Sequence, residues 1–468
     1  MQEQNEANVY EQAENKQGNN KRRTRRIRNL VFVCTVTAIV LVASTYAWFI
    51  GMQEVNVDTF EVEIAAADSL LLSLDGADWK KTIRFTEKEL IGDPTATATD
   101  EATAIAYVGN NNNWPKEGLV PLSTVGEMDS VVSEMMLYEK GGLKTTWGGY
   151  RLIASRVNNY EKEEIDPLIE LQRGYVAFDL FIKNYSGSQY IEELNPDDEE
   201  DIYLTTDSVV KVAESGGVVG SGIENSVRVA FAQIGRVNQF NNTPGDITSL
   251  TCNDNGDSGS ISFQTGICRT AQIWEPNDTY HVDGAISFYQ TSCLKRKADG
   301  HDIKDYNSYY GYSADKQTLS EEERAAHACG EVVDGTTYDT YAIKEAVASG
   351  DMVDIYDGPA YNGYDVDEEG KLIALDYFTD TEKSFKGTLR PTFMTLAPNS
   401  ITKVRVYVYI EGQDIDNYDF ASVGKKIAVN FGFSKERLTT DDIEYTGPQL
   451  DEEVYPNPEA NQTKPENN

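Results

Sequence analysis

The sequence is poor in the residue types on which many catalytic and metal sites depend. Only three histidines occur in 468 residues, which leaves little room for general-base chemistry or a histidine-built metal site. Basic residues are also scarce, with 41 Lys and Arg against 77 Asp and Glu and a formal net charge of −36. Nucleic acid repels a polyanion, so we exclude it as a partner. The low proline count, 14 residues, argues against a stalk.

The signatures of several large enzyme families are also missing. The chain contains no GxSxG, HExxH, P-loop or GxGxxG motif. Asp and Glu are so numerous that no pair of carboxylates stands out as the centre of a hydrolase. We therefore expect no enzymatic activity, and a carboxylate-based hydrolase is the least favoured of the three functions that we consider.

One long apolar segment lies near the N-terminus. Residues 31–50 carry no charge and follow six basic side chains in residues 21–28. Twenty residues at ~1.5 Å rise each cross a hydrocarbon core of ~30 Å, and a basic flank stays in the cytoplasm. We predict one apolar helix here, acting as a signal peptide or transmembrane anchor. Residues 1–20 are then a disordered cytoplasmic tail, and residues 51–440 are exported.

The end of the apolar segment resembles a signal-peptidase site. Thr45 and Ala47 are small residues at the −3 and −1 positions, which predicts cleavage between Ala47 and Trp48. The apolar run is longer than the usual signal core of ~7–15 residues, so a retained single-pass anchor is the alternative. In that case residues 31–50 hold the protein in the membrane and its N-terminus stays in the cytoplasm.

The exported part shows the period of two that is typical of β-strands. Apolar side chains at every second position bury one face of a strand and leave the other accessible. The pattern is found at 176–182, 227–231, 404–410 and 427–433, and in the segment with Phe60, Val62 and Ile64. Regular helices do not alternate with these strands. We therefore predict a mainly β fold, an antiparallel β-sandwich of jelly-roll-like type.

Loops and short helices are expected as an insertion in this sandwich, at about residues 235–370. A capping box, Ser320 with Glu323 three residues later, predicts one helix, and residues 342–349 predict another. Beyond the sandwich, residues 441–468 are acidic and rich in Pro and Asn, so we expect a disordered tail there.

Four of the five cysteines fall in the predicted insertion. Export would place them in a compartment where disulfides form, and free thiols are the alternative. Their spacings of 16, 25 and 36 lack the short pairs that zinc sites use. Four cysteines allow three pairings, of which the nearest-neighbour one joins Cys252 to Cys268 and Cys293 to Cys329.

One acidic stretch resembles a calcium-binding loop. Asp365, Asp367 and Glu369 offer oxygens at positions 1, 3 and 5, and Asp376 falls at position 12. Ile373 stands where an oxygen ligand or water is expected, so we prefer the simpler interpretation of an acidic hairpin tip. We expect no cofactor, unless this loop binds calcium.

Two polar clusters are interpreted as structural. The segment Ile273–Asp278 and His281 combine an aromatic ring, carboxylates and an imidazole, but no nucleophile or metal ligand is spaced to join them. We interpret this segment as a strand end with Trp274 packed inward, followed by a turn. The acidic residues between 414 and 419 are interpreted as a solvated loop between two strands.

Several short motifs resemble the TasA/camelysin family of exported bacterial fibre proteins. The stretch Thr45–Phe49 looks like the signal junction of that family, and a strand follows it at residues 55–64. Residues 175–190 resemble a strand and turn of the family's sandwich. Residues 404–414 and 426–433 resemble the closing strands of a larger set of similar surface proteins. The chain differs from TasA in its length, its four exported cysteines and its insertion.

The resemblance implies a surface or matrix protein that polymerises by strand donation. Phe60, Val62 and Ile64 of one copy would complete the sheet of the next, with backbone hydrogen bonds supplying affinity and alternating side chains supplying register. We therefore expect a non-enzymatic structural protein of the cell surface, extracellular matrix or biofilm, whose partner is a second copy of itself. The alternative is a membrane-anchored, adhesin-like module that binds a glycan or a protein outside the cell.

Overall fold

The fold is mainly β, as the sequence predicts. The computed structural model describes residues 61–66, 69–86, 90, 112–115, 118–141, 151–157, 174–214, 216–287, 311–312, 337–338, 341–345, 353–354, 372–418 and 426–438. All of them belong to one compact unit, Glu54–Asn468. The apolar segment at 31–50, the predicted cleavage site at Ala47 and Trp48, and Phe60 lie outside the described residues. In the part that is described, no helix is both long and apolar enough to cross a membrane.

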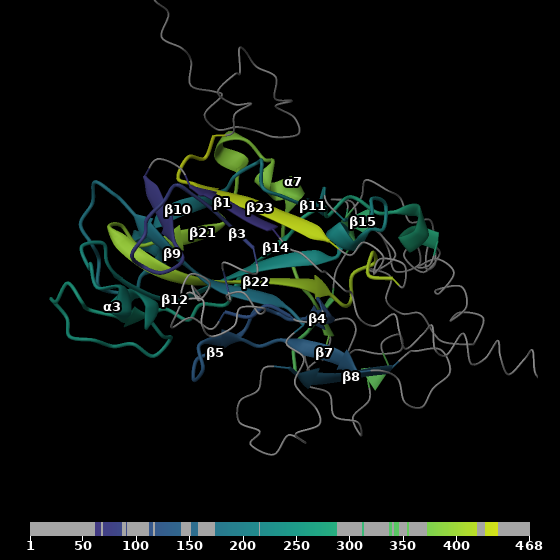
Figure 1. Ribbon diagram of the computed structural model, residues 1–468, viewed down its shortest axis with the longest axis horizontal. Helices are drawn as coiled ribbons and strands as arrows, with labels where there is room; N and C mark the ends of the chain where they lie inside the picture. Colours follow the sequence, from purple (N-terminus) through teal and green to yellow (C-terminus); the bar gives the residue numbers. More distant parts are fainter. Residues whose placement is uncertain are drawn as a thin grey trace, which may run out of the picture. The chain divides into compact units, whose positions relative to one another are not determined.

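The larger sheet is built around two twelve-residue strands. β12 (Val227–Asn238) and β22 (Ser400–Glu411) run antiparallel beside each other (Figure 1). On its other edge β22 pairs with β9 (Val176–Asn184), which in turn pairs with β2 (Leu70–Ser73). The last residues of β22 pair in parallel with β4 (Pro121–Ser123). The alternating pattern therefore located the centre of this sheet correctly.

Shorter strands extend the larger sheet at both edges. Next to β12 lie β13 (Thr265–Gly266) and β14 (Gln272–Glu275), and β14 pairs in parallel with β20 (Phe378–Thr379). Beyond β4 the sheet continues through β7 (Tyr138–Gly141), β8 (Arg151–Arg156) and β18 (Val353–Asp354). The end of β12 and all of β13 and β14 fall within the range expected as an insertion, yet they belong to the larger sheet.

The smaller sheet contains the first and the last described strands of the chain. β1 (Glu61–Ala66) pairs in parallel with β23 (Ile427–Ser434) and antiparallel with β3 (Thr82–Phe85). Three further strands lie on the other side of β23: β10 (Glu200–Leu204), β11 (Val209–Val212) and β21 (Met394–Leu396). Two segments that are more than 360 residues apart, as in the pair Ile64 and Phe431, thus become neighbours.

Both sheets contribute side chains to one hydrophobic core. Val62 and Ile64 of β1 and Phe431 of β23 belong to the same buried cluster as Val404 and Val406 of β22. Several aromatic rings in this cluster meet edge to face, a geometry that aromatic pairs prefer. The even-numbered side chains of β22 point into this core, as the period of two requires.

The opposite face of the larger sheet is buried as well. All twelve residues of β22 are buried. Tyr407 and Tyr409 belong to a second hydrophobic cluster, together with Ala230 of β12 and Met135 of β6 (Glu134–Met135). The expectation that one strand face stays accessible is therefore wrong for β22, because segments between the strands cover that face.

Two further expectations are corrected. The sheets are mixed rather than antiparallel, because β1–β23, β4–β22 and β14–β20 are parallel pairs. The helix expected at 342–349 is wrong at its start, where β17 (Tyr341–Ile343) pairs with β19 (Leu372–Ala374). Ala342 and Ile343 are fully buried, and packing outweighs the helix propensity of the segment.

The remaining described elements are short. Two more two-stranded sheets pair β5 (Met128–Asp129) with β6 and β15 (Gly311–Tyr312) with β16 (Thr337–Tyr338). The helical turns whose bounds are described include η1 (Pro196–Asp198), η2 (Ile223–Asn225), α3 (Pro244–Thr248), α7 (Asp380–Lys383) and η5 (Gly387–Leu389). The capping box expected at Ser320 lies outside the described residues.

Candidate functional site: the buried charge cluster around Arg228

The two polar segments noted in the sequence meet at one end of the larger sheet. β14 ends at Glu275 and β22 ends at Glu411, while Arg228 stands at the start of β12, opposite Tyr409 of β22. The loop at 412–418 follows β22 at the same end. Antiparallel pairing of β12 with β14 and β22 therefore brings together residues that are far apart in the sequence.

Arg228 is the centre of this cluster, and its side chain is fully buried. Its Nη2 donates to the carboxylates of Glu275 and Asp414. Its Nη1 donates to the carbonyl oxygens of Asn225 at 2.9 Å and Val227 at 3.1 Å. Burial disfavours the charged guanidinium, but Glu275 and Asp414 outweigh that effect and raise its pKa. Arg228 therefore stays charged inside the protein.

Glu411 lies beside this ion pair but favours the neutral form. The Tyr377 hydroxyl donates to Glu411 Oε2 at 3.2 Å, and the Gln413 backbone N–H donates to Oε1 at 3.1 Å. Complete burial raises the pKa of Glu411 to about 8, although the Ser123 hydroxyl and Arg228 act in the opposite direction. At neutral pH the Glu411 carboxyl group is therefore mostly protonated.

The network continues from Asp414 to His281. The Asp414 carboxylate accepts a hydrogen bond from the Asp416 backbone N–H at 2.7 Å. The Asp416 carboxylate in turn lies 2.7 Å from His281 Nδ1, and both side chains are buried. Burial raises the pKa of Asp416, and the hydrogen bond with His281 opposes that shift.

The expectation of a solvated acidic loop is therefore wrong for the two described aspartates. The side chains of Asp414 and Asp416 are 6% and 1% exposed, because each has a partner contributed by another part of the chain. Asp419 lies outside the described residues. The sequence shows the acids, but the partners Arg228 and His281 are more than 130 residues away.

The segment Ile273–Asp278 is a strand end with an inward tryptophan, as the sequence predicts. Trp274 is fully buried, and its Nε1 donates to the carboxylate of Asp380 at 2.9 Å. Asn277 follows with a positive φ of 60°, a backbone conformation that asparagine tolerates in turns. The Asn277 backbone N–H donates to the same Asp380 carboxylate at 3.1 Å, which fixes the turn to α7.

Among the described residues, the His281–Asp416 pair combines a base and an orienting acid, as in a catalytic triad. Gly222 passes close to this pair, since a Cβ placed on it would lie 3.3 Å from Asp416 Oδ1. The neighbouring hydroxyl of Ser221 is buried but makes no hydrogen bond with any described residue, so no nucleophile–base contact is formed with it. Nor do the described residues contain a group of three or more His, Cys, Asp or Glu arranged to hold a metal ion.

Of the predicted cysteine pairs, Cys252 and Cys268 form a disulfide. Cys293 and Cys329 lie outside the described residues. In the acidic stretch that resembles a calcium-binding loop, Asp376 is exposed, before β20. Asp365, Asp367 and Glu369 also lie outside the described residues.

A second buried charge cluster was missed in the sequence. Arg405 Nε donates to Asp179 Oδ1 at 2.7 Å, and Lys403 Nζ lies 3.2 Å from Asp179 Oδ2. All three side chains are buried between β9, β22 and the segments that cover them. The sequence shows opposite charges in two of the predicted strands, but only the pairing of β9 with β22, which places Asp179 opposite Arg405, brings them together.

Comparison with known proteins adds no relative from which a role could be transferred. No family model, curated protein or solved structure matches this chain. The resemblance of short motifs to the TasA/camelysin family therefore enters the functional argument only as a proposal. The geometry itself shows polar side chains that bond to one another inside the fold.

Proposed function

We propose that the protein is a non-enzymatic, exported structural protein of the cell surface or extracellular matrix, built as a jelly-roll-like β-sandwich. Copies of the chain would join by exchange of the N-terminal strand β1. The position of β1 carries this proposal. It follows the predicted leader segment, and it lies between β23 and β3 with Val62 and Ile64 in the core.

Strand β1 makes within one chain the contacts that a donated strand would make between chains. Its six residues are in register with Ala428–Phe433 of β23, which supplies a ladder of backbone hydrogen bonds. Val62 and Ile64 are 2% and 0% exposed, so alternate side chains specify the register. β2 starts four positions after β1 ends and belongs to the other sheet. An identical strand from a neighbouring copy would satisfy the same groups, as in exchanged assemblies.

The polar residues of the cluster around Arg228 support a structural role over a catalytic one. Glu275, Asp414 and Asp416 bond to groups of their own chain, and their side chains are almost completely buried. A catalytic carboxylate has to reach a substrate, whereas these groups hold a loop and two strands together.

Protein recovered from the cell surface tests the proposal directly. We expect N-terminal sequencing to find Trp48 as the first residue and electron microscopy to find filaments. An intact N-terminus on isolated particles would instead favour the membrane-anchored binding module. In that outcome, residues 31–50 would be the anchor.

Strand exchange has a sharper test in the deletion of residues 48–64. The truncated protein should stay monomeric, and filaments formed from it would rule out strand donation. If it is unstable, a synthetic peptide of residues 54–66 should bind it and restore its folded circular dichroism spectrum. The same peptide carrying Ile64→Asp is the matched control and should not bind, because a charge cannot enter the core position without a partner.

A further inference from the structure

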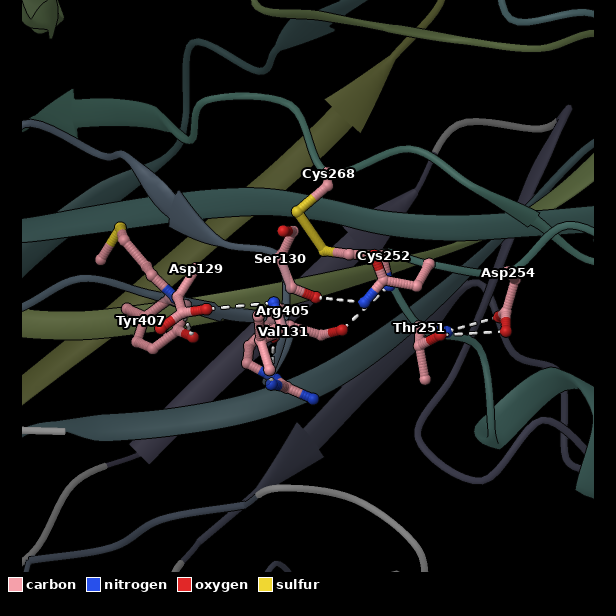
Figure 2. The surroundings of a disulfide bond; sticks show 12 residues. Asp129, Ser130, Val131, Thr251, Cys252, Asp254, Cys268, Arg405 and Tyr407 are labelled. Carbon is pink, nitrogen blue, oxygen red and sulfur yellow. Dashed lines mark hydrogen bonds between the residues drawn. A yellow bond between two sulfur atoms is a disulfide. The ribbon is translucent and has the colours of Figure 1, made fainter. Parts of the chain in front are cut away.

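The Cys252–Cys268 disulfide joins the loop at residues 248–254, which we name the covering loop, to the larger sheet (Figure 2). The Cys268 end is fixed to the sheet, because the Ile267 backbone N–H donates to Ile234 of β12 at 2.8 Å and β13 pairs with β12. The chain between the cysteines returns close to its own start. At Gly266 a Cβ would lie 2.1 Å from the Cys252 carbonyl oxygen, so only glycine fits there.

The Cys252 end of the disulfide holds the β5–β6 hairpin. The Cys252 backbone N–H donates to Ser133 Oγ at 2.9 Å, and Asn253 Nδ2 donates to the Ser130 carbonyl at 2.6 Å. Ser133 and Cys268 have φ values of 56° and 46°, in the left-handed region that side chains with a Cβ disfavour. Such conformations persist where the surrounding contacts hold them.

The hairpin in turn covers the cluster of Asp179, Lys403 and Arg405. The Ser133 carbonyl accepts from Arg405 Nη1 at 2.7 Å, and the Met135 backbone N–H donates to the Tyr407 hydroxyl at 2.9 Å. Figure 2 shows Arg405 and Tyr407 on the hairpin side of the disulfide. The ions are therefore kept from water by a segment that reaches the sheet partly through the disulfide.

The covering loop also supplies hydrogen-bond acceptors to Lys403, the other cation of the cluster. Lys403 Nζ donates to the carbonyl oxygens of Thr248 at 2.7 Å and Leu250 at 3.1 Å, just before Cys252. Without these acceptors, Lys403 would share Asp179 with Arg405 as its remaining partner. Displacement of the loop would thus leave buried charge that water stabilises better than the protein interior does.

We propose that the Cys252–Cys268 disulfide is a redox-operated latch, which when oxidised holds the β5–β6 hairpin over the Asp179–Lys403–Arg405 cluster and when reduced lets the hairpin open. Both cysteines are partly exposed, so the bridge lies near the surface and not in the hydrophobic core. Reduction removes the covalent tie and leaves backbone hydrogen bonds, such as that from the Gly266 N–H to the Asp254 carbonyl at 2.9 Å, to hold the loop. Hydration of the ions then favours the open form.

The chemistry is an exchange with a dithiol. One thiolate of the dithiol attacks a sulfur of the bridge and forms a mixed disulfide, releasing the other cysteine as a thiolate that takes up a proton. The second thiol of the dithiol then displaces the remaining cysteine. The two cysteines gain two electrons and two protons, and the dithiol becomes a cyclic disulfide. If the chain is exported as proposed, the latch is open before export and closes outside; this timing rests on the proposed function, whereas the latch does not.

Hydrogen exchange on the purified full chain, with and without dithiothreitol, tests the latch. The amides of Met135 and Met136, which donate to Tyr407 and Glu127, should exchange on the order of 100-fold faster after reduction, the factor expected for opening a loop of this length. Exchange in β1 and β23 should not change. A difference below about twofold at Met135 would overturn the proposal, and so would equal acceleration in β23, which would mean that the whole fold opens.

Cysteine variants distinguish the effect of the Cys252–Cys268 disulfide on hydrogen exchange from any effect of Cys293 and Cys329. Cys252→Ser with Cys268→Ser should reproduce the fast exchange without reductant, whereas Cys293→Ser with Cys329→Ser should leave the hairpin slow. Should the first variant fail to fold, Ser133→Gly tests the contact between Cys252 and the hairpin with the disulfide intact, and reduction of the wild type still tests the disulfide itself. Ser133→Gly removes the hydroxyl that Cys252 bonds and keeps a residue suited to the left-handed backbone, so the hairpin should again exchange faster. Slow exchange in Ser133→Gly would contradict the proposed route through Ser133.

Discussion

Arg228 on β12 and Glu275 on β14 form an ion pair across two adjacent strands inside the protein. The Arg228 side chain has no exposed surface, and that of Glu275 is 11% exposed. Asp414 gives Arg228 a second carboxylate, from the loop that follows β22. This buried cluster is stable only while Arg228 and its carboxylate partners are all present, because a charge left without them in the interior has neither water nor a counter-ion.

Replacement of Arg228 by methionine should therefore be strongly destabilising. Glu275 and Asp414 would lose their shared cation, and we expect the free energy of unfolding to fall by about 3–5 kcal/mol. Urea denaturation measures this change. The matched control is Lys211→Met, since Lys211 and Glu214 are 3.6 Å apart and largely exposed, and its effect should stay within about 0.5 kcal/mol. Similar losses in both variants would show that Arg228 is not buried as described.

Because the pKa of Glu411 is raised, we predict that the protein loses stability as the pH rises. The pKa of Glu411 is about 8 in the folded protein against an ordinary value of 4.5, so the folded state binds this proton more tightly than the unfolded state. The stabilisation is complete below the ordinary pKa and is lost as the pH rises through about 8, by at most about 1.4 kcal/mol per pH unit.

The variant Glu411→Gln isolates this contribution. Glutamine stays neutral at every pH, so the unfolding free energy of the variant should fall less steeply than that of the wild type as the pH rises from about 5 to about 8. Urea unfolding of both proteins between about pH 5 and about pH 9 gives the comparison. Parallel curves would mean that Glu411 does not titrate in this range.

The lowered pKa of Asp179 predicts the opposite dependence of stability on pH, a loss of stability as the pH falls. Burial alone would raise the pKa of Asp179, but Arg405 and Lys403 outweigh burial and lower it. The resulting stabilisation is present above the ordinary pKa and is lost as the pH falls through the lowered value. Asp179→Asn should cost about 3–5 kcal/mol near neutral pH and weaken the loss of stability in acid.

An exposed ion pair provides the reference for Asp179. Arg84 and Glu63 lie 2.7 Å apart on β3 and β1, with side chains 75% and 35% exposed. Glu63→Gln should change the unfolding free energy by no more than about 1 kcal/mol, because water screens the pair. Acid titration followed by circular dichroism should therefore separate Asp179→Asn from the wild type but not Glu63→Gln.

Strand β1 should be essential for stability. Ile64 has no exposed surface, and Ile64→Ala should cost about 2–5 kcal/mol in unfolding free energy because it leaves a cavity in the shared core. The neighbouring Ala65 is exposed, so Ala65→Ser should have an effect within about 0.5 kcal/mol. Denaturant unfolding of the two variants tests whether β1 is part of the folded unit. Equal stability of the variants would place β1 outside it.

The alternating pattern was sufficient to locate the main strands. β9, β12, β22 and β23 were all predicted, since aliphatic side chains at every second position leave few alternatives to a strand. The alternating pattern does not predict which of these strands pair with one another. The parallel neighbours β1 and β23 are the first and the last of the described strands, and local sequence carries no information on such contacts.

In the candidate site, too, local features were predictable from the sequence and contacts between distant segments were not. The turn after Trp274 was predicted because Pro276 and Asn277 are local signals. The burial of Asp414 and Asp416 was not, because it depends on Arg228 and His281 in distant segments. Acidic loops are usually solvated, and only the counter-charges reveal the exception.

The parallel pairing of β1 with β23 also constrains the order of events during synthesis. Ile64 leaves the ribosome 367 residues before its partner Phe431. At ~5–20 residues per second this interval lasts roughly 20–70 s, during which β1 can pair with β3 but has no partner on the edge that β23 later occupies. β1 therefore presents an unpaired edge through most of synthesis, and a chaperone that covers this edge would keep it from pairing with another chain.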